Sequence, residues 1–318
     1  MLFLNIVLLI IGLVLLIKGA DVFVDGASNI ARKLKIPSLI IGLTLVSIGT
    51  SAPELSISVT SALQGMNNMS FGNVIGSNTF NVLVVIGISA LFTRLAVSGG
   101  VKKIDIPILI GIYAVLILFG FVITPLVFDR IEAALFLVIF VLYVILLIFR
   151  GKKEQTDEEE SGEPIKKWYV SLILVAAGIA AIIFGGDLVV DAASKIAITF
   201  GMSELMVGLT IVAVGTSLPE LVTSVVAAKK GELDIAVGNA VGSSIMNIVL
   251  ILGASAVITP ISIDLLTLID VAVMLLSILI IFFATLKRDY VGKLTGIIML
   301  VIYCAYIAYI VLRNIGII

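Results

Sequence analysis

Ten apolar runs, each about as long as a membrane-spanning helix, dominate this sequence of 318 residues. A helix needs about 20 mostly apolar residues to cross the hydrocarbon core of a bilayer. The runs are continuous rather than alternating, which favours helices over the strands of a barrel. The sequence therefore predicts an all-α membrane protein whose helices span residues 2–24, 38–62, 71–92, 105–124, 130–149, 168–190, 204–228, 234–258, 265–285 and 294–312.

The composition agrees with a membrane protein. Hydrophobic residues make up 61% of the chain and charged residues 13%. In a soluble domain, about 45–50% of the residues are apolar and about 25% are charged. A soluble enzyme is excluded, and so is a nucleic-acid-binding protein, because 20 Lys and Arg against 21 Asp and Glu leave no basic excess. Histidine is absent and Cys304 is the single cysteine, so we expect neither an imidazole or thiolate metal site nor a disulfide framework.

One polar segment divides the chain. Residues 151–167 separate five spans from five spans, so we expect a charged linker between a first repeat at 1–150 and a second at 168–318. If the N-terminus lies outside, sixteen of the 20 Lys and Arg residues fall in inward-facing segments and three in outward-facing ones. The positive-inside rule then predicts a multi-pass protein of the cell membrane, with both termini outside and the linker in the cytoplasm.

The two halves resemble each other at an offset of 166 residues. Residues 38–62 and 204–228 are identical at fourteen of 25 positions, and GNVIGS at 72–77 matches GNAVGS at 238–243. Because each half has an odd number of spans, the second half must enter the membrane from the opposite side. The chain is therefore expected to form two inverted-topology five-helix repeats, an architecture in which secondary transporters bind ions near the midplane between broken helices.

The second and seventh spans carry the repeated motifs GTSAPE (49–54) and GTSLPE (215–220). Proline removes a backbone donor and breaks the helix. Glu54 and Glu220 place a carboxylate at membrane depth, which is costly and indicates a functional site. Calcium prefers about six to eight oxygen ligands, and two carboxylates balance its charge, whereas sodium prefers neutral oxygens. An all-oxygen set disfavours zinc, copper and iron.

Two groups of repeated residues have simpler interpretations. GNVIG and GNAVG are G-x-x-x-G motifs, which usually indicate close helix packing. Four matched aspartates near helix ends are expected to be solvated or to cap helices, and a role in ion access is the alternative. They are Asp21, Asp25, Asp187 and Asp191.

The motifs GTSAPE and GTSLPE, with GNVIGSNTFN and GNAVGSSIMN, make the chain similar to the sodium/calcium exchangers of the cation/calcium antiporter superfamily, in their compact prokaryotic form. This resemblance covers nearly the whole chain. It implies that Glu54 and Glu220 hold calcium together with Thr50 and Thr216. It also implies that sodium uses these four residues and further ligands, namely Ser51, Ser217, Ser77, Ser243 and the carbonyls of Ser47 and Ala213, with Asn81 and Asn247 lining the central position. Ca²⁺ and Na⁺ are then transported substrates rather than cofactors, and the lipid bilayer is the only other partner implied.

The expected function is the exchange of Na⁺ for Ca²⁺ by alternating access, and the resemblance implies that the first and sixth spans slide across the other eight. A Ca²⁺/H⁺ or other divalent cation antiporter stays open, because paired carboxylates can exchange protons. Relatives that depend on potassium carry Asp where this chain has Asn247, and proton-coupled relatives carry G-N-x-x-E, which is absent at Asn73 and Asn239. A passive cation channel and an intramembrane hydrolase that uses Glu54 and Glu220 are the remaining alternatives, although no nucleophile marks an enzyme.

Overall fold

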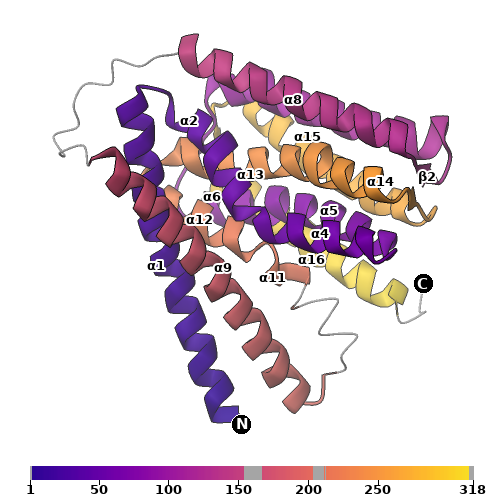
Figure 1. Ribbon diagram of the computed structural model, residues 1–318, viewed down its shortest axis with the longest axis horizontal. Coiled ribbons are helices and arrows are strands. Elements are labelled where there is room, and N and C mark those ends of the chain that lie inside the picture. Colours follow the sequence, from indigo (N-terminus) through magenta and orange to yellow (C-terminus); the bar gives the residue numbers. More distant parts are fainter. Residues whose placement is uncertain (1, 154–166, 203–210, 212, 315–318) are drawn as a thin grey trace.

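The computed structural model describes residues 2–153, 167–202, 211 and 213–314, which form an assembly of long helices (Figure 1). Within these ranges, eight helices are long and apolar enough to cross a membrane, and two helices joined at a bend of 49° make a ninth crossing if counted as one span. The prediction of an all-α membrane protein is confirmed. Of the predicted span at 204–228, residues 204–210 and 212 lie outside the described residues.

The long helices and the strands follow one another in the same order in the two halves, whereas η3 and η4 of the first half have no counterpart among the described residues of the second. The first half contains α1 (Leu2–Leu34), α2 (Ser38–Ile41), the π-helical segment η1 (Gly42–Val46), α3 (Ser47–Thr50), α4 (Ala52–Leu63), α5 (Asn67–Phe80), η2 (Asn81–Ile86), α6 (Gly87–Phe92), β1 (Leu95–Ala96), η3 (Val101–Asp105), α7 (Ile106–Leu118), η4 (Phe119–Ile123), β2 (Val127–Phe128) and α8 (Arg130–Lys153). The second half contains α9 (Trp168–Thr199), α11 (Ala213–Gly215), α12 (Leu218–Lys229), α13 (Leu233–Met246), η6 (Asn247–Leu252), α14 (Gly253–Ile258), β3 (Ile261–Ser262), α15 (Thr267–Leu286), β4 (Tyr290–Val291) and α16 (Lys293–Asn314).

The first helix of each half is longer than its predicted span. The apolar run at 2–24 stops at charged residues, but α1 continues to Leu34. Polar side chains in its last turns have partners: Asn29 Nδ2 donates to the carbonyl of Asp25 at 2.7 Å, one turn earlier in the same helix, and Asp25 pairs with Lys230 of the other half. The matching helix α9 extends beyond its predicted end in the same way.

Helices α1 and α9 pack directly against each other along a row of glycines. A Cβ atom on Gly12 would lie 2.9 Å from the carbonyl oxygen of Gly185, and one on Gly178 would lie 2.7 Å from Cβ of Phe23. Only glycine permits so close an approach of two helix backbones. Figure 1 shows the two helices as a pair, to one side of the other helices.

Two short antiparallel strand pairs join the halves. β1 of the first half pairs with β4 of the second, with Leu95 opposite Val291, and β2 pairs with β3, with Val127 opposite Ser262. At the 166-residue offset, β1 corresponds to β3. Each strand therefore pairs with a partner from the other half of the chain.

Two ion-pair clusters that the sequence analysis did not predict occupy matching places in the halves. In the first, the buried Asp105 accepts hydrogen bonds from Arg150 Nη1 at 2.8 Å and from Tyr143 Oη at 3.2 Å. In the second, the aspartate accepts from the tyrosine at 3.1 Å and from the arginine at 3.1 Å. The second cluster consists of Asp270, Tyr306 and Arg313.

Candidate ion-binding site

The helix breaks place both motif glutamates at the start of a helix. α4 and α12 each carry a proline in the first turn, where the missing N–H has no intrahelical acceptor. Ser51 and Ser217 precede these helices with backbone angles outside the helical region, at φ −84°, ψ 8° and φ −97°, ψ 9°. The predicted break of the second span is confirmed. The matching turn at Ser217 is also present, although much of the helix before it lies outside the described residues.

Each glutamate meets a serine from the other half. Ser51 Oγ donates to Glu220 Oε1 at 2.8 Å, and Ser217 Oγ donates to Glu54 Oε1 at 3.2 Å. Ser77 Oγ lies 3.1 Å from Ser217 Oγ. Both carboxylates are 0% exposed, and neither Oε2 atom has a hydrogen-bond partner among the described residues. The two halves thus contribute to one buried cluster of carboxylates and hydroxyls that retains free oxygen atoms.

Three further predicted ligands are buried and unsatisfied. Both amide atoms of Asn81 and of Asn247, and Oγ of Ser243, lack a hydrogen-bond partner within the part of the chain that the structure describes. An unpaired polar group in a protein interior costs about 1–3 kcal/mol, and such groups are rare in native structures. The two asparagines stand at matched positions of the repeat, as do Ser89 and Ser255, whose hydroxyls also lack a partner among the described residues.

The remaining predicted ligands differ between the halves. The carbonyl of Ser47 accepts the Ser51 amide at 3.0 Å, as in a regular helix. The matching amide of Ser217 instead donates to the carbonyl of Val214 at 3.2 Å, so α11, which begins at Ala213, ends in a tighter turn. The first break is thus held by a regular helical bond and the second is not.

Two asparagines beside the predicted ligands were missed by the sequence analysis. Asn73 Nδ2 donates to the carbonyl of Glu54 at 3.4 Å and to Ser58 Oγ at 2.9 Å. Asn239, 166 residues later, makes the same two bonds to the matching residues of its own half. Both lie within G-x-x-x-G motifs, where the glycines drew attention to packing. The signal that could have revealed them is an amide repeated at membrane depth in both halves.

A cavity of about 560 Å³ reaches the cluster from one side. Its lining includes Asn73, Ser77 and Thr216, together with Asp270 and Arg313 of the second ion-pair cluster. The cavity therefore connects residues of the predicted site to the ends of α15 and α16.

The two G-x-x-x-G motifs differ in how closely they are packed. Cβ atoms on Gly238 and Gly242 would lie within 3.0 Å of first-half atoms, so the packing prediction is confirmed there. Gly72 and Gly76 line the cavity instead, and no described atom lies within 4 Å of a Cβ built on either. The two halves are therefore not equally closed around the site.

The matched aspartates also behave differently in the two halves. Lys230, just after α12, pairs with Asp21 at 2.7 Å and with Asp25 at 2.6 Å, so these two residues are ion-paired as well as half-exposed. Asp191 pairs with Lys195 on its own helix at 2.6 Å. Asp187 and Asp191 line a second cavity, of about 340 Å³, that extends to both helix breaks.

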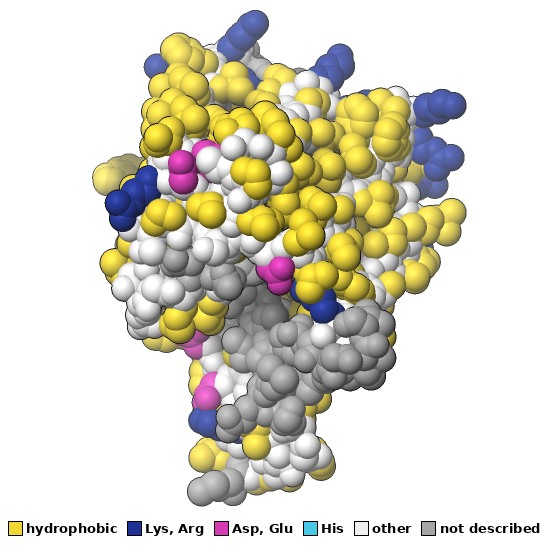
Figure 2. Space-filling model, turned by 90° about the vertical axis from the view of Figure 1, so that its right-hand side faces the viewer, with side chains coloured by type: hydrophobic (Ala, Val, Ile, Leu, Met, Phe, Trp, Pro, Cys, Tyr) yellow, Lys and Arg dark blue, Asp and Glu magenta, His cyan; other side chains and the backbone are white. Residues whose placement is uncertain are grey.

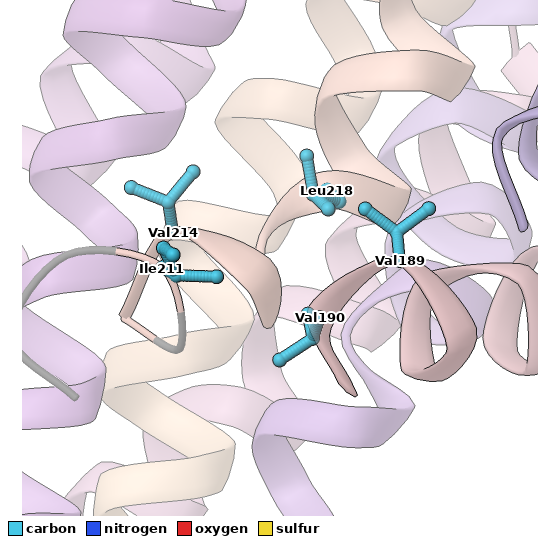
Figure 3. Close-up of a pocket in the computed structure, with 5 residues that line it drawn as sticks. All are labelled: Val189, Val190, Ile211, Val214 and Leu218. Carbon is cyan, nitrogen blue, oxygen red and sulfur yellow. The ribbon is translucent and has the colours of Figure 1, made fainter. Parts of the chain in front are cut away.

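A third cavity, of about 340 Å³, lies between α9 and the start of α12 (Figure 3). Its five lining residues carry no carboxylate or hydroxyl, so it offers no cation ligands. It leaves space beside α9 at the second helix break. The lining residues are Val189, Val190, Ile211, Val214 and Leu218.

Comparison with known proteins places this geometry in a family. Residues 4–149 and 170–312 match the sodium/calcium exchanger protein family. The chain is 38% identical to the inner membrane protein YrbG of Escherichia coli (strain K12) over 81% of each chain. It is 30% identical to the sodium/calcium exchanger MaX1 of Methanosarcina acetivorans, over 96% of this chain and 98% of the relative. A structure of the sodium-calcium exchanger NCX_Mj, soaked with zero Na⁺ and Ca²⁺, superposes with a TM-score of 0.85 at 30% identity, over 97% of this chain and 99% of that one. The chain belongs to the sodium/calcium exchanger family, a family of membrane transporters.

Proposed function

We propose that the protein exchanges Na⁺ for Ca²⁺ across the membrane by alternating access. The observation that carries this proposal is the crossed pair of contacts in which Ser51 meets Glu220 and Ser217 meets Glu54. A buried cluster with two carboxylates, built from both halves, suits a divalent cation that must be released to either side. The relation to MaX1, which is named a sodium/calcium exchanger, supports the choice of ions.

Calcium and sodium would compete for the same oxygens. Two carboxylates neutralise one Ca²⁺, and hydroxyl and amide oxygens complete a shell of about six to eight ligands. Sodium, with one charge, depends more on the neutral oxygens. Because either ion excludes the other, loading with one promotes release of the other. The proposed ligands are Glu54, Glu220, Thr50, Thr216, Ser51, Ser217, Ser77, Ser243, Asn81, Asn247, and the carbonyls of Ser47 and Ala213.

We further infer that the chain forms ten spanning helices in two inverted repeats, at 1–150 and 168–318. The cross-paired strands support this topology, because β1 with β4 and β2 with β3 bring loops of opposite halves to a common membrane face. One G-x-x-x-G motif is closely packed and the other lines a cavity. This difference is expected if the two repeats have different conformations in the same structure.

The orientation follows from the basic residues. Figure 2 shows several Lys and Arg side chains at one end of the molecule, beyond a broad surface of hydrophobic side chains, and fewer of them elsewhere on this face. If that end is cytoplasmic, the large cavity lined by Asp270 and Arg313 opens to the outside. Ser161→Cys on a Cys304→Ala background tests this: an impermeant thiol reagent should label the linker only after the cytoplasmic side is made accessible. Labelling in intact cells would reverse the orientation.

Counterflow in proteoliposomes tests the function. Vesicles loaded with sodium should accumulate radioactive calcium, vesicles loaded with potassium should not, and the uptake should saturate. Uptake that depends on a pH gradient and not on sodium would replace the proposal with Ca²⁺/H⁺ exchange, which the free Oε2 atoms of Glu54 and Glu220 would support. Unsaturable uptake that is independent of either gradient would indicate a channel.

A further inference from the structure

Asn239 links the two halves at the edge of the proposed ion site. Its side chain is 0% exposed, in the middle of α13. Nδ2 donates to the carbonyl of Glu220 at 3.3 Å and to Ser224 Oγ at 3.0 Å, both in the second half. Its Oδ1 lies 3.0 Å from Oγ1 of Thr50, in the first half. One amide therefore contacts a proposed ligand of one half and the backbone of a proposed ligand of the other.

The chemistry of the amide fixes the direction of the Thr50 contact. Flipping the amide would break the bond to the Glu220 carbonyl, which can only accept, and would set the amide oxygen against that carbonyl oxygen. Oδ1 can only accept a hydrogen bond, so the contact at 3.0 Å is favourable only if Thr50 Oγ1 donates its proton. A contact between two lone pairs at this distance would be repulsive.

The direction of this proton matters for cation binding. A hydroxyl group coordinates a cation through an oxygen lone pair, and its proton must then point elsewhere. With the proton held by Asn239, the lone pairs of Thr50 face away from the amide. Thr50 Oγ1 also lies 3.1 Å from the carbonyl of Val46 and 3.4 Å from that of Ser47, so Asn239 Oδ1 is the nearest of these three acceptors. The Glu220 carboxylate interacts with the same hydroxyl.

The repeat supplies a second instance of the two bonds between an asparagine and the glutamate turn. Asn73 donates to the carbonyl of Glu54 and to Ser58 Oγ, as Asn239 does to their counterparts. Asn73 and Thr216 both line the large cavity on the open side of the site. The pair of amide bonds to the glutamate turn is thus present in both halves.

We propose that Asn239 is a positioning residue for calcium, which orients the Thr50 hydroxyl so that its oxygen faces the ion and holds the first turn of α12 beneath Glu220. This inference rests on the proposed function. It predicts that Asn239 acts through Thr50, although it does not itself bind the ion. Loss of a partner that orients a metal ligand typically costs about 10- to 100-fold in affinity.

A double-mutant cycle on the purified protein tests the inference, with calcium affinity measured by titration calorimetry. Asn239→Leu should weaken calcium binding about 10- to 100-fold, and it should do so equally in a Thr50→Ser background, where the hydroxyl is retained. In a Thr50→Val background the same change should have a much smaller effect. If the loss of calcium affinity in the double variant equals the combined losses of Asn239→Leu and Thr50→Val to within about twofold, the two residues act independently and the inference is overturned.

Asn78→Leu is the matched control. Asn78 is also 0% exposed, and it donates to the carbonyl of Val74 and accepts from Tyr113 Oη at 3.0 Å, so neither bond involves Glu54 or Glu220. It should lower thermal stability and leave calcium affinity within about twofold of wild type. If Asn239→Leu does not fold, Asn239→Ala completes the same cycle. Wild-type protein that binds no calcium would refute the proposed function together with this inference, whereas tight wild-type binding with an additive cycle would refute the inference alone.

Discussion

Replacing Glu220 by Gln should change ion selectivity rather than destroy the fold. Gln has nearly the same shape as Glu and keeps an oxygen that can accept the Ser51 hydroxyl, which now lies 2.8 Å from Glu220 Oε1. The side chain is 0% exposed, and its Oε2 has no partner among the described residues. The substitution therefore removes one negative charge from the site without breaking the contact between the halves.

The size of the effect follows from charge. Two unit charges 4 Å apart interact by about 4 kcal/mol at an effective dielectric constant near 20. A divalent ion beside the carboxylate therefore gains about 8 kcal/mol, and a monovalent ion about 4 kcal/mol. If reorganisation of the site offsets half of each, calcium affinity falls by about 4 kcal/mol, roughly a thousandfold, and sodium affinity by about 2 kcal/mol, roughly thirtyfold.

Titration of each ion into purified protein measures both losses, and proteoliposome flux measures their consequence. Glu132→Gln is the control, because Glu132 is a buried glutamate outside the site that accepts from Thr124 Oγ1 and from the Asp129 amide. It should leave both affinities unchanged. Equal losses for calcium and sodium in Glu220→Gln would refute the electrostatic reasoning, and near wild-type calcium affinity would remove Glu220 from the site.

Three further predictions concern the site and its support. Apparent calcium affinity should fall as pH is lowered from neutral to mildly acid values, because protons compete for the same carboxylates; a flat profile in calcium titrations would contradict this. Asn247→Asp adds a third carboxylate, so calcium should bind more tightly and leave more slowly at neutral pH, with exchange recovering in acid; unchanged affinity, rate and pH dependence would place Asn247 away from the ions. Gly178→Ala places a Cβ atom 2.7 Å from Phe23 Cβ and should destabilise the protein by about 1–3 kcal/mol. Gly111→Ala is the control: no neighbouring described atom lies within 4 Å of a Cβ built there, so stability should not change. Thermal melts in detergent compare the two, and equal melting temperatures would show that the glycine row is not tightly packed.

The break in the second span was predictable because its cause is local. Pro53 interrupts hydrogen bonding wherever the helix is placed, and the repeat at Pro219 marks the break as a designed feature. The presence of both glutamates in one cluster was likewise expected from the internal repeat. The ends of the long helices were not predictable from apolar runs, because α1 continues through polar residues that find partners only in the folded protein, such as Asp25 with Lys230.

The crossed contacts and the asparagines could not be derived from the sequence for a different reason. Which serine meets which glutamate depends on how the halves pack, and Ser51 could equally have faced Glu54 of its own motif. Asn239 gains its role from Thr50 in the other half. The cluster around Asp105 is hidden in the sequence because a basic residue at the end of an apolar run, such as Arg150, indicates only orientation, although its guanidinium is buried against that aspartate.

The strand pairs between the halves have a consequence for biosynthesis. When the ribosome has completed the first half, β1 and β2 have been made, but their partners β4 and β3 have not. Glu54 likewise waits for Ser217. The early chain therefore has unpaired strand edges in its loops and a buried carboxylate whose serine partner has not yet been made. The unit on which cellular quality control acts is the whole chain, and a truncated first half should be recognised as unfinished and degraded.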